Sequence, residues 1–360
     1  MTLGAGCPEL EAGVGPARPV RVVVAGGGKM GVVHAAVLSM MPGVTLAGFH
    51  DVAPGAATRL RGMGFTAPVS ADLGALLRDR RPDAAWICTP PDAHLAVART
   101  CIEAGVPVFV EKPLAQSLDA ARELAAVARA RGVPLACGYT LAFWPSFALA
   151  RHLLRRDVVG AVRSVRSSMV CSQVSGPQRG WMYEHARSGG GVVANLSSHL
   201  LFVLCWIFGT PTRVEASWRH VHSRVEDELD ATLHAPGGVE IRFESSWCVP
   251  GFPISRTVLE VEGEHGRLAA SNDALDLTLA RPVSGLPAGM AHLGPADLPQ
   301  PAGFELNGEA YSLEDAHFLR WVTGGPPPPI DADAALSVQT VMDALYRSAE
   351  RGVAVEVPSE

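Results

Sequence analysis

The sequence predicts a two-domain protein whose first domain is an α/β fold with a doubly wound parallel sheet. Three observations predict it. Short apolar, β-branched runs alternate with helix-like stretches between residues 20 and 140. The first run leads directly into a glycine-rich turn, and polar residues stand where later runs end. Strands that alternate with helices form a parallel sheet, and its ligands bind beyond the carboxyl ends of the strands.

The composition is that of a globular protein with more than one core. The chain has 360 residues, of which 48% are hydrophobic and 18% are charged, and this length allows two domains. Thirty basic residues stand against 36 acidic ones, which predicts neither nucleic-acid nor membrane binding. Seven scattered cysteines without a C-x-x-C pair indicate reduced thiols. With no signal peptide evident, we expect a cytoplasmic protein.

The first strand is expected at 20–25, and a glycine turn follows it. Gly26, Gly28 and Gly31 fit the pattern G-x-G-x-x-G, and the helix-period stretch 34–41 comes next. In this pattern the first glycine permits a tight turn and the second lets the backbone approach a pyrophosphate. The third lets the helix pack close to the strand. Free N–H groups at the helix N-terminus face the phosphates, so the turn predicts a dinucleotide site.

A carboxylate stands at the end of the second expected strand, 44–49. Asp51 lies twenty residues after Gly31, where it would accept hydrogen bonds from the adenosine ribose hydroxyls. The same charge would repel the 2′-phosphate of NADP. NAD is therefore the expected cofactor and NADP the second choice, because Arg59 and Arg61 could reach round to a phosphate. An aspartate that only caps the following helix is the alternative.

The remainder of the first domain continues the alternation. Ser70 and Ser117 are expected to cap helices. Thr89, Lys112 and Tyr139 follow strands, so we expect them to lie at the ligand edge of the sheet. The expected elements are helix 72–80, strand 84–88, helix 94–104, strand 106–110, a helix from Ser117 to Gly132, and strand 135–137.

The second half of the chain reads as strands around one buried helix. The apolar stretch 191–209 is interrupted by polar residues and indicates a core helix rather than a membrane span. The span 281–303 is rich in Pro and Gly and predicts a long surface loop. A last helix is expected at 334–351. Strand-like runs occur at 162–171, 213–220, 229–235, 239–247 and 257–262.

Four motifs in one order resemble the Gfo/Idh/MocA family, which includes glucose–fructose oxidoreductase and inositol dehydrogenase. They are the glycine turn 26–31, Thr-Pro-Pro-Asp-Ala-His at 89–94, Glu-Lys-Pro at 111–113, and a triple glycine followed by a helical histidine at 189–199. The resemblance implies an NAD(P)-binding Rossmann domain and an α+β domain with an open, mostly antiparallel sheet. It also implies a homodimer or homotetramer joined through the open sheet face. The expected segments are a flexible leader 1–19, the Rossmann domain 20–140, a substrate domain 141–330, and a C-terminal helix 331–360 packed back on the Rossmann domain.

The resemblance also implies the role of each site residue. Lys112 would hydrogen-bond the reacting oxygen and steady its charge, while His199 would act as general base or acid. Asn195 lies four residues before His199, so both can face one substrate. A core role is the alternative for His199 and for Trp181. The implied cofactor site contains Gly26, Gly28, Lys29, Met30, Gly31, Asp51, Thr89, Pro90, His94, Glu111 and Lys112, and the implied substrate site Tyr139, Trp181, Asn195 and His199.

The sequence departs from the family pattern in three places: Asn195 replaces a usual aspartate, Phe202 replaces a frequent acid, and 140–144 lacks the polar and basic residues that members often have there. The pocket is therefore expected to be less polar than one for a free sugar. The expected activity is hydride transfer between nicotinamide and a secondary alcohol or ketone of a sugar, cyclitol or related molecule. An NAD-retaining hydrolase or lyase, and a catalytically weakened nucleotide-binding or regulatory homologue, are the alternatives. No metal site is predicted, because the pair His220 and His222 lacks a third ligand at suitable spacing.

Overall fold

The computed structural model describes residues 7–10, 16–298 and 310–358 in two compact units. The first, named here the parallel-sheet unit, contains the described residues of 16–140 and 310–336. The second, named the mixed-sheet unit, contains those of 7–10, 141–298 and 337–358. Each unit has its own sheet and its own helices, and each is described by itself.

The parallel-sheet unit contains a six-stranded sheet in the order β3-β2-β1-β4-β5-β6, and every neighbouring pair is parallel. Every residue of β4 is buried, as is typical of a strand covered on both faces. This confirms the predicted doubly wound Rossmann-type fold. The strands are β1 (Val20–Ala25), β2 (Val44–His50), β3 (Val69–Ser70), β4 (Ala84–Ile87), β5 (Val108–Val110) and β6 (Leu135–Cys137).

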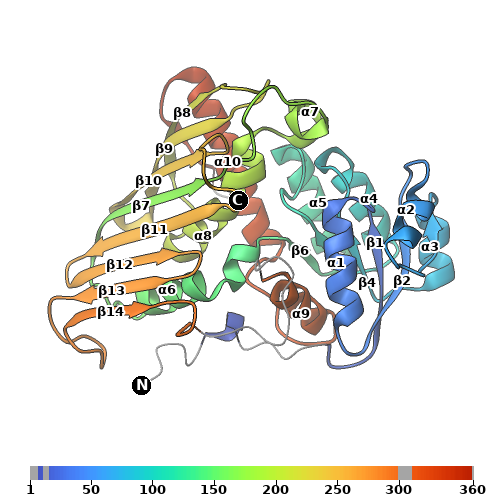
Figure 1. Ribbon diagram of the computed structural model, residues 1–360, viewed down its shortest axis with the longest axis horizontal. Helices are drawn as coiled ribbons and strands as arrows, with labels where there is room; N and C mark the ends of the chain where they lie inside the picture. The colour runs from blue at the N-terminus through green and yellow to red at the C-terminus, as the bar shows by residue number, and fades with distance from the viewer. Residues whose placement is uncertain (1–6, 11–15, 299–309, 359–360) are drawn as a thin grey trace. The chain divides into compact units, whose positions relative to one another are not determined.

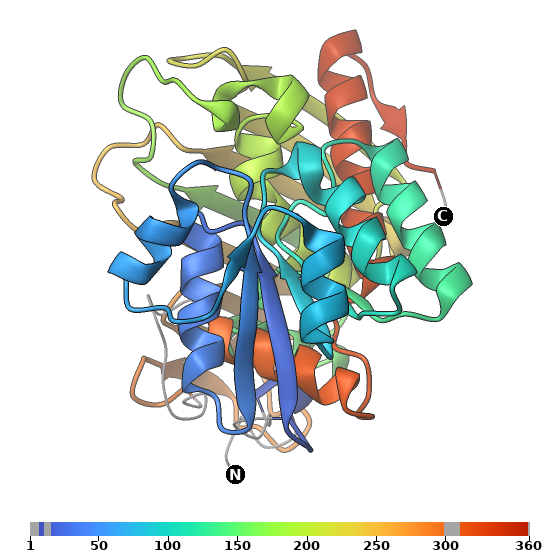
Figure 2. The same cartoon turned by 90° about the vertical axis from the view of Figure 1, so that its right-hand side faces the viewer.

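Helices cover both faces of this sheet. Figure 2 shows α1 in blue on one side of the strands and α4 in cyan on the other. Ser117 caps α5 as predicted, since its side chain accepts from the Ala120 N–H. The expected cap at Ser70 is wrong, because Ser70 ends β3 and Asp72 caps α3 instead. The helices are α1 (Lys29–Met40), α2 (Ala56–Gly62), α3 (Leu73–Arg80), α4 (Pro91–Glu103), α5 (Leu118–Arg131) and α9 (Tyr311–Val322).

The mixed-sheet unit contains a nine-stranded sheet in the order β14-β13-β12-β11-β7-β10-β9-β8-β15 (Figure 1). Every neighbouring pair is antiparallel except β7 and β10. The open, mostly antiparallel sheet is therefore confirmed. The strands are β7 (Val162–Val170), β8 (Arg213–Arg219), β9 (Glu228–Ala235), β10 (Val239–Ser246), β11 (Arg256–Gly263), β12 (Gly266–Ser271), β13 (Leu275–Leu279), β14 (Gly289–Leu293) and β15 (Val355–Glu356).

Helices cover one face of the nine-stranded sheet. Side chains of β7 alternate between this buried face and the open one, so that Val165 and Met169 are buried while Arg166 is exposed. Helix α8 contacts β7, and α6 contacts β12. The helical segments of this unit include η1 (Pro8–Leu10), η2 (Thr140–Phe143), α6 (Pro145–Arg155), η3 (Trp181–Tyr183), α7 (His185–Ser188), the π-helical turn η4 (Val193–Ser197), α8 (Ser198–Phe208) and η5 (Pro236–Gly238).

The residues of the last helix, α10 (Ala332–Arg351), are divided between the two units. Most of it belongs to the mixed-sheet unit, where Ser348 accepts the N–H of Ala216 and β15 pairs with β8. Only its first residues belong to the parallel-sheet unit, together with α9. Whether 331–360 pack back on the Rossmann domain therefore stays a prediction.

Two segments that were expected to be loops, the leader 1–19 and the span 281–303, contain buried residues or a strand. Cys7 is fully buried, and Glu9 forms an ion pair of 3.0 Å with Arg151, so residues 7–10 are not a loose leader; 1–6 and 11–15 lie outside the described residues. The span 281–303 contains the edge strand β14, and its residues 299–303 also lie outside the description.

The helical stretch 185–208 is long and apolar enough to cross a membrane by length and composition alone. Within the chain, however, 67% of its most apolar window is buried. Its apolar side chains therefore pack against the rest of the mixed-sheet unit, as a core helix does. This agrees with the buried helix predicted at 191–209.

Candidate functional site

Of the three glycines at 26, 28 and 31 that fit the pattern at the end of β1, the chain itself requires two and does not require the third. A Cβ at Gly26 would lie 2.5 Å from the Cys88 carbonyl oxygen, and one at Gly31 would lie 1.8 Å from the Gly26 carbonyl oxygen. A Cβ at Gly28 would meet no atom within 4 Å. The missing side chain of Gly28 therefore leaves open space in front of α1, whose N-terminus no side chain caps.

Asp51 supports this turn from the end of β2. Its Oδ2 accepts from the Gly27 N–H at 2.8 Å, and its Oδ1 accepts from the Ala53 N–H at 2.7 Å. The N-cap of α2 is Gly55, so Asp51 does not cap that helix. Arg59 Nη2 lies 3.5 Å from Asp51 Oδ2, which places one of the two anticipated arginines beside the carboxylate.

The His94 ring lies between the turn that follows β4 and the turn that follows β5. Its ring is buried, with Nε2 2.8 Å from the Thr89 carbonyl oxygen and Nδ1 3.0 Å from the Pro113 carbonyl oxygen. Burial lowers the pKa of His94, although the carbonyls oppose this. A neutral ring donates to one of these carbonyls, so His94 contacts main chain where a direct cofactor contact is expected.

A second buried histidine holds the Glu-Lys-Pro motif. Glu111 follows β5; its Oε1 lies 3.0 Å from His34 Nε2, and its Oε2 accepts from the Lys112 N–H at 3.1 Å. His34 Nδ1 lies 2.9 Å from Asp315 Oδ1, which also accepts from Trp86 Nε1 at 2.8 Å. The Glu111 side chain thus points into the parallel-sheet unit, where it fixes the turn that carries Lys112.

The charge state of His34 follows from these contacts. Burial alone would lower the pKa of His34, but the carboxylates of Asp315 and Glu111 raise it well above the ordinary value. His34, Glu314 and Asp315 offer ligand atoms within 4.8 Å of one another, as a metal site does. A protonated imidazole has no lone pair left for a metal. Burial raises the pKa of Asp315, although His34 and Trp86 oppose this. Because each ring nitrogen of His34 faces a carboxylate oxygen, at 2.9 and 3.0 Å, the geometry favours a buried imidazolium between carboxylates.

The helix that carries His199 lies in the mixed-sheet unit. Among residues 191–200 every side chain is buried except those of Asn195 and His199, which are half-buried. The two residues thus share the less buried side of the helix, as their spacing of four residues predicts. The π-helical turn Val193–Ser197 precedes His199, and such turns occur often at functional sites.

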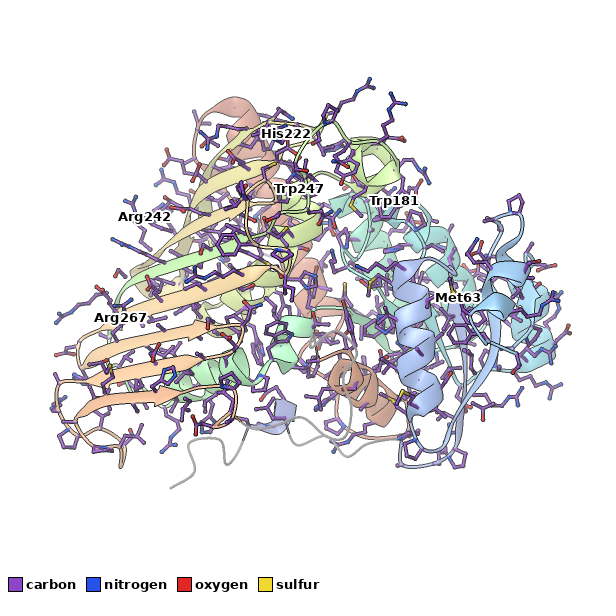
Figure 3. The ribbon with its side chains drawn as sticks, viewed as in Figure 1. Met63, Trp181, His222, Arg242, Trp247 and Arg267 are labelled. Carbon is purple, nitrogen blue, oxygen red and sulfur yellow. The ribbon has the colours of Figure 1, made fainter. Side chains whose placement is uncertain are left out.

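The remaining predicted residues are placed as follows. Lys29 and Met30 begin α1, Pro90 precedes α4, and the Tyr139 side chain is fully buried at the end of β6. Trp181 is half-buried in η3, outside the core of the mixed-sheet unit (Figure 3). The structure thus gathers the residues predicted to bind the cofactor at the carboxyl ends of the parallel strands, and it places Trp181, Asn195 and His199 in the mixed-sheet unit.

Comparison with known proteins decides the family. Residues 20–139 match the oxidoreductase family with an NAD-binding Rossmann fold, and residues 147–269 match the GFO/IDH/MocA C-terminal domain. The chain belongs to the Gfo/Idh/MocA family. As a member it is an oxidoreductase, and the expected NAD-binding domain is confirmed.

Several relatives show how far the likeness extends. The crystal structure of GenD2 from gentamicin A biosynthesis, in complex with NAD, is 30% identical and covers 95% of this chain and 97% of its own, with a TM-score of 0.79. D-xylose 1-dehydrogenase (NADP(+)) 2 of Haloferax volcanii is 29% identical over 79% of this chain and 83% of its own length. Levoglucosan dehydrogenase with NADH and levoglucosan shares the fold, with a TM-score of 0.85 at 20% identity.

Other matches are shorter. Trans-1,2-dihydrobenzene-1,2-diol dehydrogenase of Sus scrofa is 28% identical over 48% of this chain and 50% of its own length. An uncharacterized oxidoreductase of Synechocystis matches over 44% of this chain and 43% of its own length.

The geometry of the parallel-sheet unit fits a dinucleotide. The space in front of Gly28 would be filled by a Cβ, and Thr89 Oγ1 is a buried atom without a hydrogen-bond partner among the described residues. The turn at Gly28 would hold the pyrophosphate, and Asp51 the adenosine ribose.

Proposed function

We propose that this Gfo/Idh/MocA protein is an NAD-dependent dehydrogenase or reductase that acts on a secondary alcohol or ketone of a sugar, cyclitol or related small molecule. The open turn at Gly28 beside Asp51 carries the proposal, because it combines room for a pyrophosphate with an acceptor for ribose hydroxyls. The names of relatives that act on D-xylose and on a dihydrobenzene diol support a small alcohol as substrate.

The chemistry divides between two side chains. Bound NAD would supply the hydride acceptor for oxidation of the carbinol carbon, and its reduced form would supply the hydride for the reverse direction. Lys112 donates a hydrogen bond to the reacting oxygen and stabilises the negative charge that develops there. His199 takes the hydroxyl proton during oxidation and gives it back during reduction.

The environment of His199 indicates a weakly polar pocket. Asn195 can orient a substrate hydroxyl through its amide, but it carries no charge to stabilise an imidazolium. Phe202 is buried in α8 and stacks on Trp206 at 5.9 Å between ring centroids. At the position where family members often have an acid, this chain therefore has an apolar side chain that packs in the core. We infer a substrate with fewer free hydroxyls than a simple hexose near His199.

The nucleotide site is tested by binding. NADH should bind more tightly than NADPH, and Asp51→Ala should weaken NADH by about 10-fold, because ribose contacts and support of the turn are lost together. Isothermal titration measures both affinities, and nicotinamide fluorescence with added sugars and cyclitols measures turnover. A folded, cofactor-free protein that binds neither nucleotide would refute the proposal. Net reduction of added NAD separates a dehydrogenase from a hydrolase, a lyase or a regulatory homologue.

Two glycine variants make a matched pair for the same titration. Gly28→Ala meets no atom and keeps an ordinary φ of −75°, so the protein should fold normally while the added methyl obstructs the pyrophosphate. Gly31→Ala forces a Cβ onto the Gly26 carbonyl, so it should lower the melting temperature as well. Unchanged NADH affinity in Gly28→Ala would contradict a pyrophosphate at this turn.

We propose that the protein is a cytoplasmic homodimer or homotetramer that associates through the open sheet face. A hollow of about 460 Å³ on this face is lined by β7, β10 and β11, and Arg242 and Arg267 point outward from the sheet (Figure 3). Arg166 stands opposite Arg242, and Glu244 opposite Asp230. Like charges directly opposite one another are unfavourable, and a second copy related by a two-fold axis could set arginines against acids.

Sedimentation velocity tests the association, and Arg242→Glu should shift it toward the monomer. A wild-type protein that sediments as a monomer at micromolar concentration would exclude the oligomer. Cell fractionation tests the compartment, where the seven free cysteines are expected to stay reduced.

A further inference from the structure

One residue satisfies three consecutive backbone N–H groups at the start of the His199 helix. Glu226 Oε1 accepts from Gly191 N at 2.7 Å and from Val193 N at 3.1 Å, while its main-chain oxygen accepts from Val192 N at 2.8 Å. The first N–H groups of a helix have no partner inside the helix. A local side chain usually caps them, but no side chain of this turn does so.

Tyr346 completes the arrangement from α10. Its hydroxyl donates to Glu226 Oε1 at 2.7 Å, and its ring packs against Trp218 and His185 at 5.4 and 5.7 Å between centroids. Burial and the Glu226 carboxylate raise the pKa of Tyr346 well above its ordinary value. The phenol therefore keeps the proton that it donates. Three donors thus converge on one carboxylate oxygen of a residue that is 3% exposed.

Two residues of the triple glycine are required because the Tyr346 side chain and the Glu226 main chain approach the backbone so closely. A Cβ at Gly190 would lie 1.7 Å from Tyr346 Oη, and a Cβ at Gly191 would lie 2.1 Å from the Glu226 carbonyl oxygen. Gly190 also has a φ of +147°. Gly190 and Gly191 are thus explained by the contact with Glu226 and Tyr346 inside the mixed-sheet unit, whereas Gly189 ends α7 with a φ of +79°.

The chain segment that carries Glu226 is itself anchored. The neighbouring Asp227 accepts from Trp247 Nε1 and, through Oδ2, from the N–H groups of Val221, His222 and Ser223. Burial would raise the pKa of Asp227, but these donors lower it to about 2. Asp227 therefore stays ionised and holds the loop, so that Glu226 is presented to the helix from a fixed position.

The contacts of Glu226 and Tyr346 with residues 190–193 lie at the start of the π-helical turn Val193–Ser197. Asn195 N donates to the Gly191 carbonyl oxygen at 2.9 Å, and the wider turn continues to Ser197. A π-helical turn inserts one extra residue into an α-helix, so it rotates all following side chains by about 100° relative to the residues before it. Without an anchor, the first turn can slip into regular α-helical pairing, and Asn195 then changes its orientation relative to His199.

We propose that Glu226 and Tyr346 are positioning residues for the reaction: they fix the start of the helix and thereby the direction in which Asn195 and His199 meet the substrate. The proposal rests on the proposed function of His199. Neither residue needs to touch substrate or cofactor.

Steady-state kinetics of four variants tests the proposal. Glu226→Ala should lower kcat by about 100-fold, as a misplacement of about 1 Å does, with the NADH dissociation constant unchanged. Glu226→Gln keeps an acceptor oxygen and should restore most of kcat. Tyr346→Phe keeps the ring and should give a smaller loss of about 5-fold. Ser348→Ala is the matched control, because it removes a bond between α10 and β8 without touching the helix start.

A second readout does not depend on turnover. NMR of labelled histidine, assigned with His199→Asn, should show the His199 ring signals shifted in Glu226→Ala and in Tyr346→Phe but not in Ser348→Ala. If the wild type has no turnover, the proposed function fails while the NMR comparison still decides the positioning role. If Glu226→Ala does not fold, Tyr346→Phe decides. Variants whose kcat and His199 signals match those of Ser348→Ala would overturn the proposal.

Discussion

Replacing His199 with asparagine is expected to lower kcat by about 10²- to 10⁴-fold, the range for loss of a general acid or base. The affinity for NADH should not change, because the proposed nucleotide contacts are made by Gly28 and Asp51 in the other unit. Lys112→Met should produce a loss of similar size, since it removes the donor to the reacting oxygen. Stopped-flow measurement of nicotinamide absorbance separates the chemical step from binding.

Asn195→Asp is the matched variant on the same helix side. A carboxylate there should stabilise the imidazolium and raise the pKa of His199, which moves the acidic limb of the pH–rate profile to higher pH. His199→Asn with wild-type kcat would remove this residue from the mechanism. An unchanged pH profile in Asn195→Asp would instead show that the side chain at 195 does not interact with His199.

Replacing Asp315 with alanine is expected to destabilise the protein by about 3–5 kcal/mol, as breaking one side of a buried ion pair does. The His34 imidazolium and Trp86 Nε1 would both lose their acceptor in a fully buried site. Arg129→Ala is the control, because its pair with Asp333 is exposed and should contribute less than about 1 kcal/mol. Urea unfolding measures both. Equal effects of the two variants would contradict a charged buried cluster.

The His34 cluster also predicts a dependence on pH. The folded-state pKa of His34 is raised above 6.5, so its contribution to stability is complete below about 6.5 and is lost as the pH rises through the folded-state pKa. The folded-state pKa of Glu111 is lowered below 4.5 by His34, despite burial, so its contribution is lost as the pH falls below 4.5. The stability difference between wild type and His34→Gln should therefore be largest between about 4.5 and 6.5. A difference that does not vary with pH would show that His34 is uncharged.

Local sequence patterns were sufficient for the parallel sheet and for most of the mixed sheet. The strands β1 to β6, except the two-residue β3, could be predicted from β-branched runs bounded by turns. Strands β12 to β15 were not predicted. Small residues break the alternation in β12 and β14, and β15 has only two residues. The leucines of β13 alternate regularly with polar residues, so this strand could have been recognised. The wrong cap at Ser70 has a simple reason: serine and aspartate have similar capping preference, so only the geometry selects Asp72.

The parts of the site formed by residues close in sequence could be predicted. The contacts between residues far apart in sequence could not. The glycine turn and the shared face of Asn195 and His199 follow from spacing alone. The contact between His34 and Asp315 joins residues 281 positions apart, and that between Glu226 and Tyr346 joins residues 120 apart. A buried histidine in an apolar helix and an unexplained triple glycine were the only signals of these contacts in the sequence.

Residues 310–336 belong to the parallel-sheet unit. The N-terminal half of the chain is therefore not a complete unit by itself. A fragment cut at residue 140 would keep every strand of the six-stranded sheet but would lack α9, and with it Asp315, one of the two carboxylates that contact His34. Such a fragment would leave the buried His34 with Glu111 but without Asp315, next to the turn that holds Lys112. The N-terminal half therefore cannot be transferred to another protein by itself. Any chimaera or split version of this enzyme has to include residues 310–336 together with the N-terminal half.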